Sequence, residues 1–526
     1  MENIGYRGNK NLKRSNVEMS FTEEQIKEYI KCADDPIYFV ENYVKVVHVD
    51  KGLIPMKLYD FQKTVIRESD ANRRVIAKIG RQAGKSSCIA VFALHQALFK
   101  ENYNILIAAN KAKTALEIMK KVQTAYEYLP QWLKQGLGEW NKGTVTFENG
   151  SRIMGTSTSA DSARGFSFNC VILDEFAFLP KGVADDFFTS IYPTISSGKT
   201  TKMIIISTPK GMNMFYKIWT EAVEGRSDYI PIEINWWDVP GRDQKFKEEQ
   251  IRNFGEERWR QEYECVFIGS SNTLISSNKI KEMTYINPIE RINGVEIFEK
   301  PKADRKYFIA VDPAEGKGLD YHAFVVIDIT QKPFNVVATF RDKYMEPLLV
   351  PDILYHVGKI YNDAFILIET KSSGTQISDI MFYQKEYLNL LGAKAMGRGG
   401  QVLTTYSKQA KGLATSTTTK SVGCSNFKLL IENDQLLTND FNILEEITNF
   451  VLNGNSWGAD DGYHDDLVMC LVIFAWATTQ TYFKNFSSVN IQDVLDERKK
   501  ELQNNFLPLF IIDSDEDGWT EDSGFF

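Results

Sequence analysis

The sequence feature that most constrains this chain is residues 79–86, which read Ile-Gly-Arg-Gln-Ala-Gly-Lys-Ser. An apolar run precedes it at residues 75–77, and a longer apolar run follows at residues 88–98. This order predicts a strand, a tight turn and a helix. Backbone N–H groups at the start of a helix point toward an anion, and the helix dipole favours negative charge there. The segment therefore predicts a phosphate-binding loop.

The end of this segment carries the chemistry of a nucleotide site. Lys85 would reach the β and γ phosphates, and the Ser86 hydroxyl would hold Mg²⁺. The usual spacing places a glycine five residues before Gly84, but Ile79 stands there and the only other glycine is Gly80. The alternative is an ordinary loop that contains Gly-Lys-Ser by coincidence.

Two further apolar runs favour the nucleotide site over that alternative. Residues 171–173 lead into Asp174 and Glu175, and residues 203–206 lead into a polar Ser-Thr-Pro tip. An aspartate at the end of a buried strand suits Mg²⁺ held through water, and a neighbouring glutamate can orient and deprotonate the attacking water. Ligands of open α/β sheets bind at the carboxyl ends of strands, where all three segments would lie. An isolated acid pair could instead end a strand in a solvated turn.

A second set of acidic residues lies in the C-terminal half. The acids that end two predicted strands or open a predicted helix are Asp312, Glu369, Asp465 and Asp466. Such residues can converge on one edge of a sheet, where their repulsion is prohibitive unless cations lie between them. Two Mg²⁺ or Mn²⁺ ions, roughly 3.5–4 Å apart, would then support phosphodiester cleavage. Taken singly, each acid could equally cap a strand or a helix.

Length and composition limit the remaining possibilities. A chain of 526 residues is too long for one ordinary core, so we expect two or three domains. We expect no transmembrane helix, and residues 1–23 lack the apolar core of a signal peptide. The six cysteines are scattered without a CxxC pair, which favours reduced thiols in a cytoplasmic protein. The net charge of −8 permits only local basic patches for nucleic acid.

The motifs resemble those of one protein family. They are Arg-Gln-Ala-Gly-Lys-Ser at 81–86, Ala-Arg-Gly-Phe-Ser at 163–167, Val-Ile-Leu-Asp-Glu at 171–175 and Ser-Thr-Pro-Lys-Gly at 207–211. In this order they resemble the large terminase subunit of tailed bacteriophages, closest to the T-even-like group. The resemblance extends from about Tyr59 to about Ala477. It implies an α/β chain with an N-terminal P-loop ATPase domain, which has a mostly parallel sheet and a small lid, and a C-terminal ribonuclease-H-like nuclease domain.

The resemblance also implies site residues. Those expected around the nucleotide are Gln62, Gly80, Arg81, Gln82, Ala83, Gly84, Lys85, Ser86, Asp174, Ser207 and Thr208. Among them Gln62 would read adenine, Arg81 would supply positive charge in the transition state, and Glu175 would be the general base. Ser207 and Thr208 would couple hydrolysis to movement. The expected nuclease metal ligands are Asp312, Glu369 and Asp466, with Asp465 as the alternative to Asp466 and with Glu315 and Asp320 in second rank.

The expected domain organisation has five parts. They are a flexible arm at 1–20, an ATPase domain at 21–270 with its lid at about 236–270, a linker at 271–302, a nuclease domain at 303–484 and an acidic tail at 485–526. Residues 245–260 are expected to form one charged lid helix. The lysines at 111, 113, 120 and 121 are expected on a solvated helix face. Residues 397–400 and 415–420, with Arg398 and Lys420, are expected in mobile loops.

The resemblance thus implies a DNA-packaging motor. It would use ATP and Mg²⁺, or Mn²⁺ in the nuclease, to move double-stranded DNA into a prohead and to cut concatemeric DNA into headful lengths. The resemblance implies a small terminase subunit and a portal protein as partners, with five copies on the portal, in the host cytoplasm. A chromosomal helicase-nuclease is one alternative. A non-enzymatic capsid or DNA-bridging protein is the other.

Overall fold

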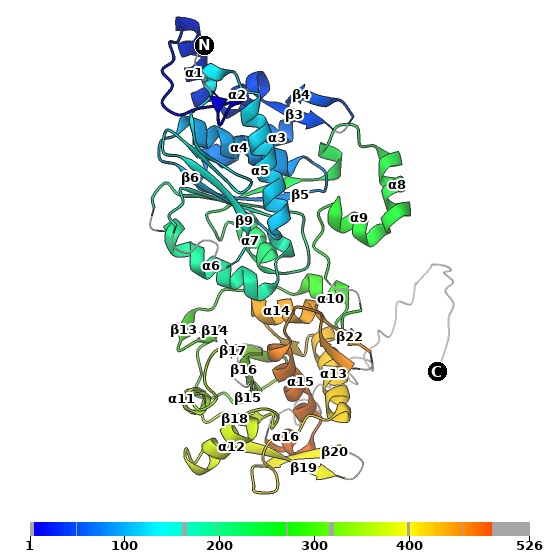
Figure 1. Ribbon diagram of the computed structural model, residues 1–526. Helices are drawn as coiled ribbons and strands as arrows, with labels where there is room; N and C mark the ends of the chain where they lie inside the picture. The colour runs from blue at the N-terminus through cyan, green and yellow to red at the C-terminus, as the bar shows by residue number, and fades with distance from the viewer. Residues whose placement is uncertain are drawn as a thin grey trace, which may run out of the picture. The chain divides into compact units, whose positions relative to one another are not determined.

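The computed structural model divides into two compact units (Figure 1). It describes residues 5–48, 50–159, 166–196, 198–269, 272–314, 320–396, 400–454 and 456–486. The first unit comprises Met1–Met283 and Phe441–Asp465, and the second comprises Thr284–Asp440 and Asp466–Phe526. The division after Met283 falls within the predicted linker. Residues 441–465, which were expected in the nuclease domain, group with the first unit.

An eight-stranded sheet forms the centre of the first unit. Its strands, in spatial order, are β12 (Ile230–Ile234), β5 (Arg74–Ile79), β11 (Lys202–Ser207), β10 (Cys170–Asp174), β6 (Asn104–Ala109), β9 (Arg152–Ser157), β8 (Thr144–Phe147) and β7 (Leu137–Trp140). The first six are parallel, and β8 and β7 continue the sheet antiparallel. Asp174 pairs with Ile206 on one side and Ala109 on the other. The carboxyl ends of these strands therefore share one edge.

Helices cover both faces of this sheet, as parallel strands require. In β5, Val75 and Ala77 belong to one apolar core, while Ile76 between them belongs to another. The first core contains side chains of α3 (Asp60–Ala71), α4 (Lys85–Phe99) and α5 (Ala112–Glu127). The second contains side chains of η2 (Phe176–Phe178), α6 (Lys181–Ser196) and α7 (Met214–Val223). The short helix η1 spans Gln131–Leu133.

The N-terminal segment is not wholly the flexible arm that we predicted. Strands β1 (Gly5–Tyr6) and β2 (Asn9–Lys13) pair antiparallel, and Leu12 is buried. Lys13 Nζ donates to the carbonyl of Lys134 at 2.9 Å, which attaches this hairpin to the first unit. Further elements are α1 (Glu23–Asp34), which begins with a capping box at Thr22, α2 (Pro36–Tyr43), β3 (Lys45–His48) and β4 (Gly52–Pro55).

The lid segment contains η3 (Trp236–Asp238), α8 (Gln244–Phe254) and α9 (Glu256–Glu262). The prediction of one helix over residues 245–260 is therefore wrong. Gly255 has φ of 85°, a left-handed conformation that ends α8 and is easy only for glycine. The two helices pack around aromatic rings, with Trp259 stacked on Tyr263 at 4.8 Å.

A second sheet forms the centre of the second unit. Its path is β13 (Glu290–Ile292), β14 (Val295–Ile297), β17 (Phe334–Asp342), β16 (His322–Asp328), β15 (Tyr307–Asp312), β18 (Phe365–Ile368), β19 (Leu390–Met396) and β20 (Gly400–Thr405), and β21 (Leu436–Leu437) pairs with β17. Strands β15, β18 and β19 are parallel. Strand β16 pairs antiparallel with β15, and β17 pairs antiparallel with β16. Because β13 and β14 join this sheet, the later part of the predicted linker belongs to the second unit.

Helices also cover this second sheet. Alternate residues of β15, such as Ile309 and Val311, face a core that includes side chains of α11 (Val350–Ile360) and α12 (Gly374–Tyr383). On the opposite face Phe308 contacts Phe474 of α15 (Asp466–Thr478), with ring centroids 5.4 Å apart. Helix α15 is apolar on all sides, and α13 (Thr417–Glu432) packs against it. Helix α16 (Thr481–Phe486) follows.

The remaining elements correct two more predictions. Residues 417–420, expected in a loop, form the first turn of α13, which Ser416 caps by accepting a hydrogen bond from the N–H of Thr419. Residues 397–399, including Arg398, lie outside the described part, as does the acidic tail beyond α16. Helices α10 (Ser277–Glu282) and α14 (Phe441–Thr448) and strands β22 (Phe450–Asn453) and β23 (Ser456–Ala459) belong to the first unit. Among the described helices, none is long and apolar enough to cross a membrane.

The contact between α13 and α15 predicts the effect of adding one methyl group. A Cβ at Gly423 would lie 2.6 Å from the carbonyl oxygen of Val472, so Gly423→Ala forces the helices apart. We expect a loss of about 1–3 kcal/mol in the unfolding free energy of the second unit. Urea denaturation followed by intrinsic fluorescence would measure it. Ser425→Ala, at an exposed position of the same helix, is the control, and equal stability of the two variants would contradict the packing.

Candidate functional sites

The predicted phosphate-binding loop connects β5 to α4 with the geometry expected of it. Gln82 and Gly84 have φ of 58° and 79°, so the backbone turns sharply before the helix begins at Lys85. Glycine is required at position 84 for a second reason, because a Cβ there would lie 2.6 Å from Gln62 Nε2. Ser86 lies in the first turn of α4, where free N–H groups face an anion. The loop can therefore hold the phosphates of a nucleotide.

Gln62, the predicted adenine reader, lies against this loop. Its side chain is buried, its Nε2 donates to the carbonyl of Ala83 at 3.2 Å, and its Oε1 accepts from the N–H of Tyr59 at 3.1 Å. The amide thus links the start of α3 to the phosphate loop. The rings of Tyr59 and Phe61 stack beside it, with centroids 5.6 Å apart.

The lid contacts the loop from another side. The N–H groups of Gly80 and Arg81 donate to the carbonyls of Ile234 and Glu262, at 2.8 and 2.7 Å. The Arg81 side chain, predicted to act in the transition state, is exposed, with its Nη1 3.4 Å from Glu262 Oε1. The lid segment and the phosphate loop are therefore joined by backbone and side-chain contacts.

Arg242 is a site residue that sequence reasoning missed. Its Nη2 donates to the carbonyls of Arg81 and Gln82 at 3.0 and 3.1 Å. Its guanidinium lies over the rings of Phe246 and Tyr263, 5.1 and 5.6 Å from their centroids, an arrangement that favours a cation. Its burial lowers the pKa of the guanidinium from the ordinary value. The side chain fixes the outward-facing carbonyls of the loop, and no motif in the sequence marks it.

Asp174 has the electrostatic properties of a cation ligand. Its side chain is buried at the end of β10, and its Oδ1 accepts no hydrogen bond from the described residues. Burial raises the pKa of Asp174 to about 6, and Glu175 adds to the rise, while Lys85 opposes it. A divalent cation beside this carboxylate would replace the missing hydrogen bond and favour the charged form.

Glu175 and Ser207 are connected through one turn. Glu175 has φ of 55°, an uncommon conformation for a residue with a Cβ, and it leads directly into η2. Ser207 Oγ accepts from the N–H of Ala177 in that helix at 3.1 Å and donates to the carbonyl of Thr208 at 2.7 Å. Asn213 Nδ2 donates to the Ala177 carbonyl at 2.7 Å. The tip of β11 thus holds the turn that carries the predicted general base.

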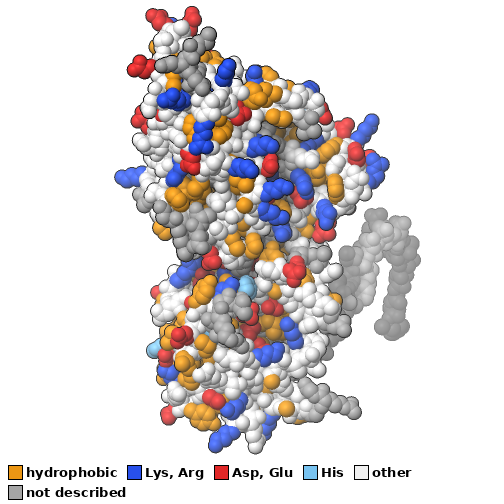
Figure 2. Space-filling view, viewed as in Figure 1, with side chains coloured by type: hydrophobic (Ala, Val, Ile, Leu, Met, Phe, Trp, Pro, Cys, Tyr) orange, Lys and Arg blue, Asp and Glu red, His pale blue; other side chains and the backbone are white. Residues whose placement is uncertain are grey.

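One lysine of α5, exposed as predicted, also contacts the start of α4. Figure 2 shows Lys and Arg side chains gathered on the part of the first unit where α5 lies in Figure 1. Among the lysines of α5, Lys121 Nζ donates to Ser87 Oγ at 3.2 Å, in the first turn of α4. Its charge also lowers the pKa of Asp174 slightly. Lys121 therefore belongs to the surroundings of the phosphate loop.

In the second unit, register places two predicted acids on one edge and one face of the sheet. Val311 of β15 pairs with Ile368 of β18 in parallel, so Asp312 and Glu369 stand at adjacent strand ends. Val311 and Ile368 face the α11–α12 core, so the residues that follow them face α15. Asp466 is the first residue of α15, and it is buried. Cys470, one turn further along α15, donates to the carbonyl of Ala323, the residue paired with Asp312, so the start of α15 lies at the same edge and face as Asp312 and Glu369.

The carboxylates are not a preassembled metal cage. Among the described residues, no three His, Cys, Asp or Glu side chains lie close enough together to hold a metal ion. Glu369 is buried, and its Oε1, which accepts no hydrogen bond from described residues, lies 3.4 Å from Lys371 Nζ. A buried carboxylate needs a positive charge beside it, and a metal ion would supply that charge here. In the metal-free chain the ammonium group of Lys371 supplies part of it.

The other candidates for the nuclease site are placed as follows, with Asp465 in the first unit and the rest in the second. Asp465 lies beside β23, since a Cβ at Gly458 would be 3.7 Å from its Oδ2. Asp320 is exposed just before β16, and Glu315 lies outside the described residues. His322 was missed from the sequence. It is buried, its Nδ1 accepts from the N–H of Ala314 at 3.1 Å, and burial lowers the pKa of this imidazole, so a neutral ring positions the chain after Asp312.

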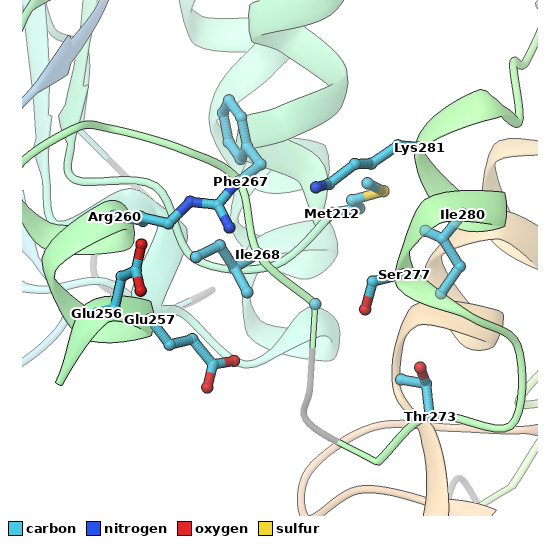
Figure 3. Close-up of a pocket in the computed structure, with 11 residues that line it drawn as sticks. Met212, Glu256, Glu257, Arg260, Phe267, Ile268, Thr273, Ser277, Ile280 and Lys281 are labelled. Atoms are coloured by element: carbon cyan, nitrogen blue, oxygen red, sulfur yellow. The ribbon is translucent and has the colours of Figure 1, made fainter.

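A separate cavity of about 380 Å³ lies within the first unit (Figure 3). Arg260 and two glutamates of α9 face it from one side, and Ser277, Ile280 and Lys281 of α10 face it from the other. Its lining includes none of the predicted site residues, so it adds nothing to the two sites above.

Two family models match the chain. Residues 76–282 match the model described as "Terminase large subunit, T4likevirus-type, N-terminal", and residues 309–477 match the model described as "Terminase RNaseH-like domain". The first match contains the phosphate loop and Asp174, and the second contains Asp312, Glu369 and Asp466. The type named in the first description agrees with the predicted resemblance to the T-even-like group.

Individual relatives are similar over most of the chain. The large terminase subunits of Thermus phage G20c and Thermus virus P23-45 are each 27% identical over 451 residues, covering 78% of this chain and 85% of the relative. The crystal structure of the HK97 bacteriophage large terminase aligns with a TM-score of 0.49 and 14% identity, covering 85% of this chain and 99% of that chain. With the central strands of both sheets lying in segments matched by terminase models, the chain belongs to the family of large terminase subunits, with an N-terminal P-loop ATPase domain and a C-terminal RNase H-like nuclease domain.

Proposed function

We propose that this chain is the motor subunit that hydrolyses ATP to move double-stranded DNA into a prohead, and that its second unit cuts concatemeric DNA into packaged lengths. One observation carries the proposal. A single chain of this family presents a phosphate loop beside a buried aspartate at one sheet edge and three acids at the edge of a second sheet. The test is ATP-driven protection of linear duplex DNA from nuclease in the presence of matching empty proheads.

In the first unit, positioned charge supplies most of the proposed catalysis. Lys85 neutralises the β and γ phosphates, while Ser86 and Asp174 hold the Mg²⁺ that accompanies ATP. Glu175 orients and deprotonates the attacking water. Arg81 leaves Glu262 and contacts the phosphate as negative charge develops in the transition state. Ser207 and Thr208 then couple hydrolysis to movement through the hydrogen bond between Ser207 and Ala177.

Gln62 serves the nucleotide in two ways in this proposal. Its contact with Ala83 holds the phosphate loop in shape, and its amide lies at the loop edge where adenine would reach it. Because an amide both donates and accepts, a small rotation lets it exchange the Tyr59 N–H for the adenine edge.

In the second unit, Asp312, Glu369 and Asp466 are the proposed ligands of Mg²⁺ or Mn²⁺. Two such ions, when bound, supply the activation of water and the stabilisation of the leaving 3′ oxygen. Asp466 is preferred over Asp465 because it is buried at the start of α15, whereas Asp465 lies beside β23. Bound ions would offset the repulsion among the three carboxylates and would replace the contact of Glu369 with Lys371. Asp320 and Glu315 remain secondary candidates.

The partners proposed are those of a packaging motor. A small terminase subunit selects the DNA, and a portal protein carries about five copies of this chain, in the host cytoplasm, on the prohead. The net charge of −8 agrees with weak, local contact to DNA by the subunit alone. The comparisons give no support to a helicase-nuclease, which would need a second ATPase core and would separate the strands of a forked duplex.

The first prediction concerns ATP turnover. Lys85→Ala removes the cation at the phosphates, and Glu175→Gln removes the base, so each should lower turnover at least about a hundredfold. Phosphate release would measure this, and Glu175→Gln should still bind ATP. Lys113→Ala, at an exposed position of α5, is the control. Near-normal turnover by either site variant would refute the nucleotide site.

A pH prediction follows from the buried aspartate. Since the pKa of Asp174 is raised to about 6, protons compete with Mg²⁺ below that pH. The Mg²⁺ concentration for half-maximal ATP turnover should rise about tenfold between pH 7 and pH 5. Lowering the pH should weaken Mg²⁺ binding but should stabilise the metal-free chain against unfolding. The folded chain binds the proton of Asp174 more tightly than the unfolded chain does, because folding raises this pKa.

Asp174→Asn is the control for this pH dependence. The asparagine variant should bind Mg²⁺·ATP weakly at every pH and should lack the acid-dependent stability difference. A wild-type Mg²⁺ requirement that is constant from pH 7 to pH 5 would show that Asp174 does not hold the ion.

The two sites should be separable. Asp312→Asn keeps the side-chain shape at a strand end but removes a charge that holds metal, so cutting of plasmid DNA should stop while ATP turnover and packaging of pre-cut linear DNA continue. Lys85→Ala should do the reverse. Gel assays of cutting and prohead protection assays measure the two activities. Asp304→Asn, exposed near the opposite end of β15, is the control.

Thermal melts must match for all three variants, so that a loss of activity is not a loss of fold. If Asp312→Asn also stops packaging of linear DNA, the two sites are coupled. If it still cuts at the normal rate, the metal site lies elsewhere.

A further inference from the structure

A row of cross-strand neighbours connects the nuclease edge to a basic side chain. Asp312 of β15 pairs with Ala323 of β16, and Ala323 pairs with Arg341 of β17. Directly paired residues of antiparallel strands lie on the same face of a sheet. Asp312 and Arg341 therefore share the face toward α15, two strand spacings or about 10 Å apart, with only the small side chain of Ala323 between them.

An aromatic ring gathers a second cation at the same place. The guanidinium of Arg341 and the ammonium of Lys343 each lie 5.4 Å from the centroid of the Tyr321 ring. All three side chains are partly exposed, and the adjoining Tyr344 is 71% exposed. We call Tyr321, Arg341 and Lys343 the cationic strip. Attraction between the ring and the two cations holds them beside each other despite their mutual repulsion.

The cationic strip lies beside a sheet edge that carries three carboxylates and must nevertheless bind a negatively charged DNA strand. Three carboxylates repel a DNA strand, and metal ions offset that repulsion only at the scissile phosphate. A strand that enters the site therefore needs positive charge at neighbouring phosphates. Two acids lie close to the strip in the sequence: Asp342 Oδ1 is directed to a turn, where it accepts from the N–H groups of Tyr344 and Met345, and Asp320 is exposed to solvent.

We propose that Arg341 and Lys343, held by Tyr321, bind backbone phosphates of the DNA strand next to the phosphate that is cut. Arginine and lysine donate to phosphate oxygens without reading bases, so the contact is independent of sequence. The strip positions the strand over Asp312 and leaves the metal ligands unchanged. This proposal rests on the nuclease function proposed above.

The test uses the full chain and plasmid DNA with Arg341→Gln/Lys343→Gln. We expect kcat/KM for cutting to fall about tenfold or more. The slope of log(kcat/KM) against log[salt] should become shallower by about 1.8, since each lost phosphate contact contributes about 0.9. Tyr321→Leu, which removes the ring but neither charge, should give a smaller loss. ATP turnover should not change.

Lys300→Gln/Lys302→Gln is the matched control. These lysines are exposed and lie near the start of β15, at the end of the strand away from Asp312, so the same change in charge should leave cutting unaltered. Melting temperature and the Mg²⁺-induced shift of that temperature should match wild type in every variant. An unchanged salt slope would overturn the proposal. A lost Mg²⁺ shift would also overturn it, because the strip would then support the metal site.

Asp312→Asn, measured in parallel, distinguishes failure of this proposal from failure of the nuclease assignment. Normal cutting by that variant would refute the nuclease site itself. Loss of cutting by Asp312→Asn, with normal cutting by the strip variant, would refute only the strip.

Discussion

The site in the first unit depends on the parallel register of four adjacent strands. With β5, β11, β10 and β6 in register, their carboxyl ends form one edge, and a charged residue placed there faces the start of α4. Because successive side chains of a strand point to opposite faces of the sheet, residues at neighbouring strand ends are directed to different faces. Asp174 follows Ile172 toward the core beneath α4, whereas Ser207 follows Ile205 toward the core that contains η2. One face carries the proposed site for phosphate and metal, and the other contacts the turn that carries Glu175.

The phosphate loop is held from outside as well as from the helix below it. Gln62 accepts and donates on one side, while Ile234, Glu262 and Arg242 bind backbone groups on the other. The N–H groups of Gly80 and Arg81 and the carbonyls of Arg81, Gln82 and Ala83 are all bonded outward, so the anion-binding N–H groups are those at the start of α4. The same contacts join the lid to the loop, through Arg242 just before α8 and Glu262 at the end of α9.

Sequence reasoning succeeded where a local pattern carries the information. Acids that follow apolar runs located Asp174, Asp312 and Glu369, because a buried parallel strand needs such a run and its end reaches the sheet edge. It failed where contacts between residues far apart in the sequence determine which side chains reach a site or which unit a segment joins. Arg242 precedes an ordinary helix, and only folding brings it to the loop. The grouping of residues 441–465 with the first unit likewise depends on contacts such as that between Leu274 and Phe450.

In both sites the charges of the side chains are complementary to the expected ligand, but the two sites carry charges of opposite sign. The first unit collects cations, such as Lys85 and Lys121, around one buried carboxylate, because its ligand brings its own negative phosphates. The proposed nuclease site of the second unit instead gathers carboxylates, which would hold metal ions before a phosphodiester arrives. Such an edge repels its own substrate, and strand pairing offers the simplest remedy: a cation two strands away on the same face. Arg341 occupies that position, opposite Ala323, where a small neighbour leaves its side chain free of steric competition with Asp312.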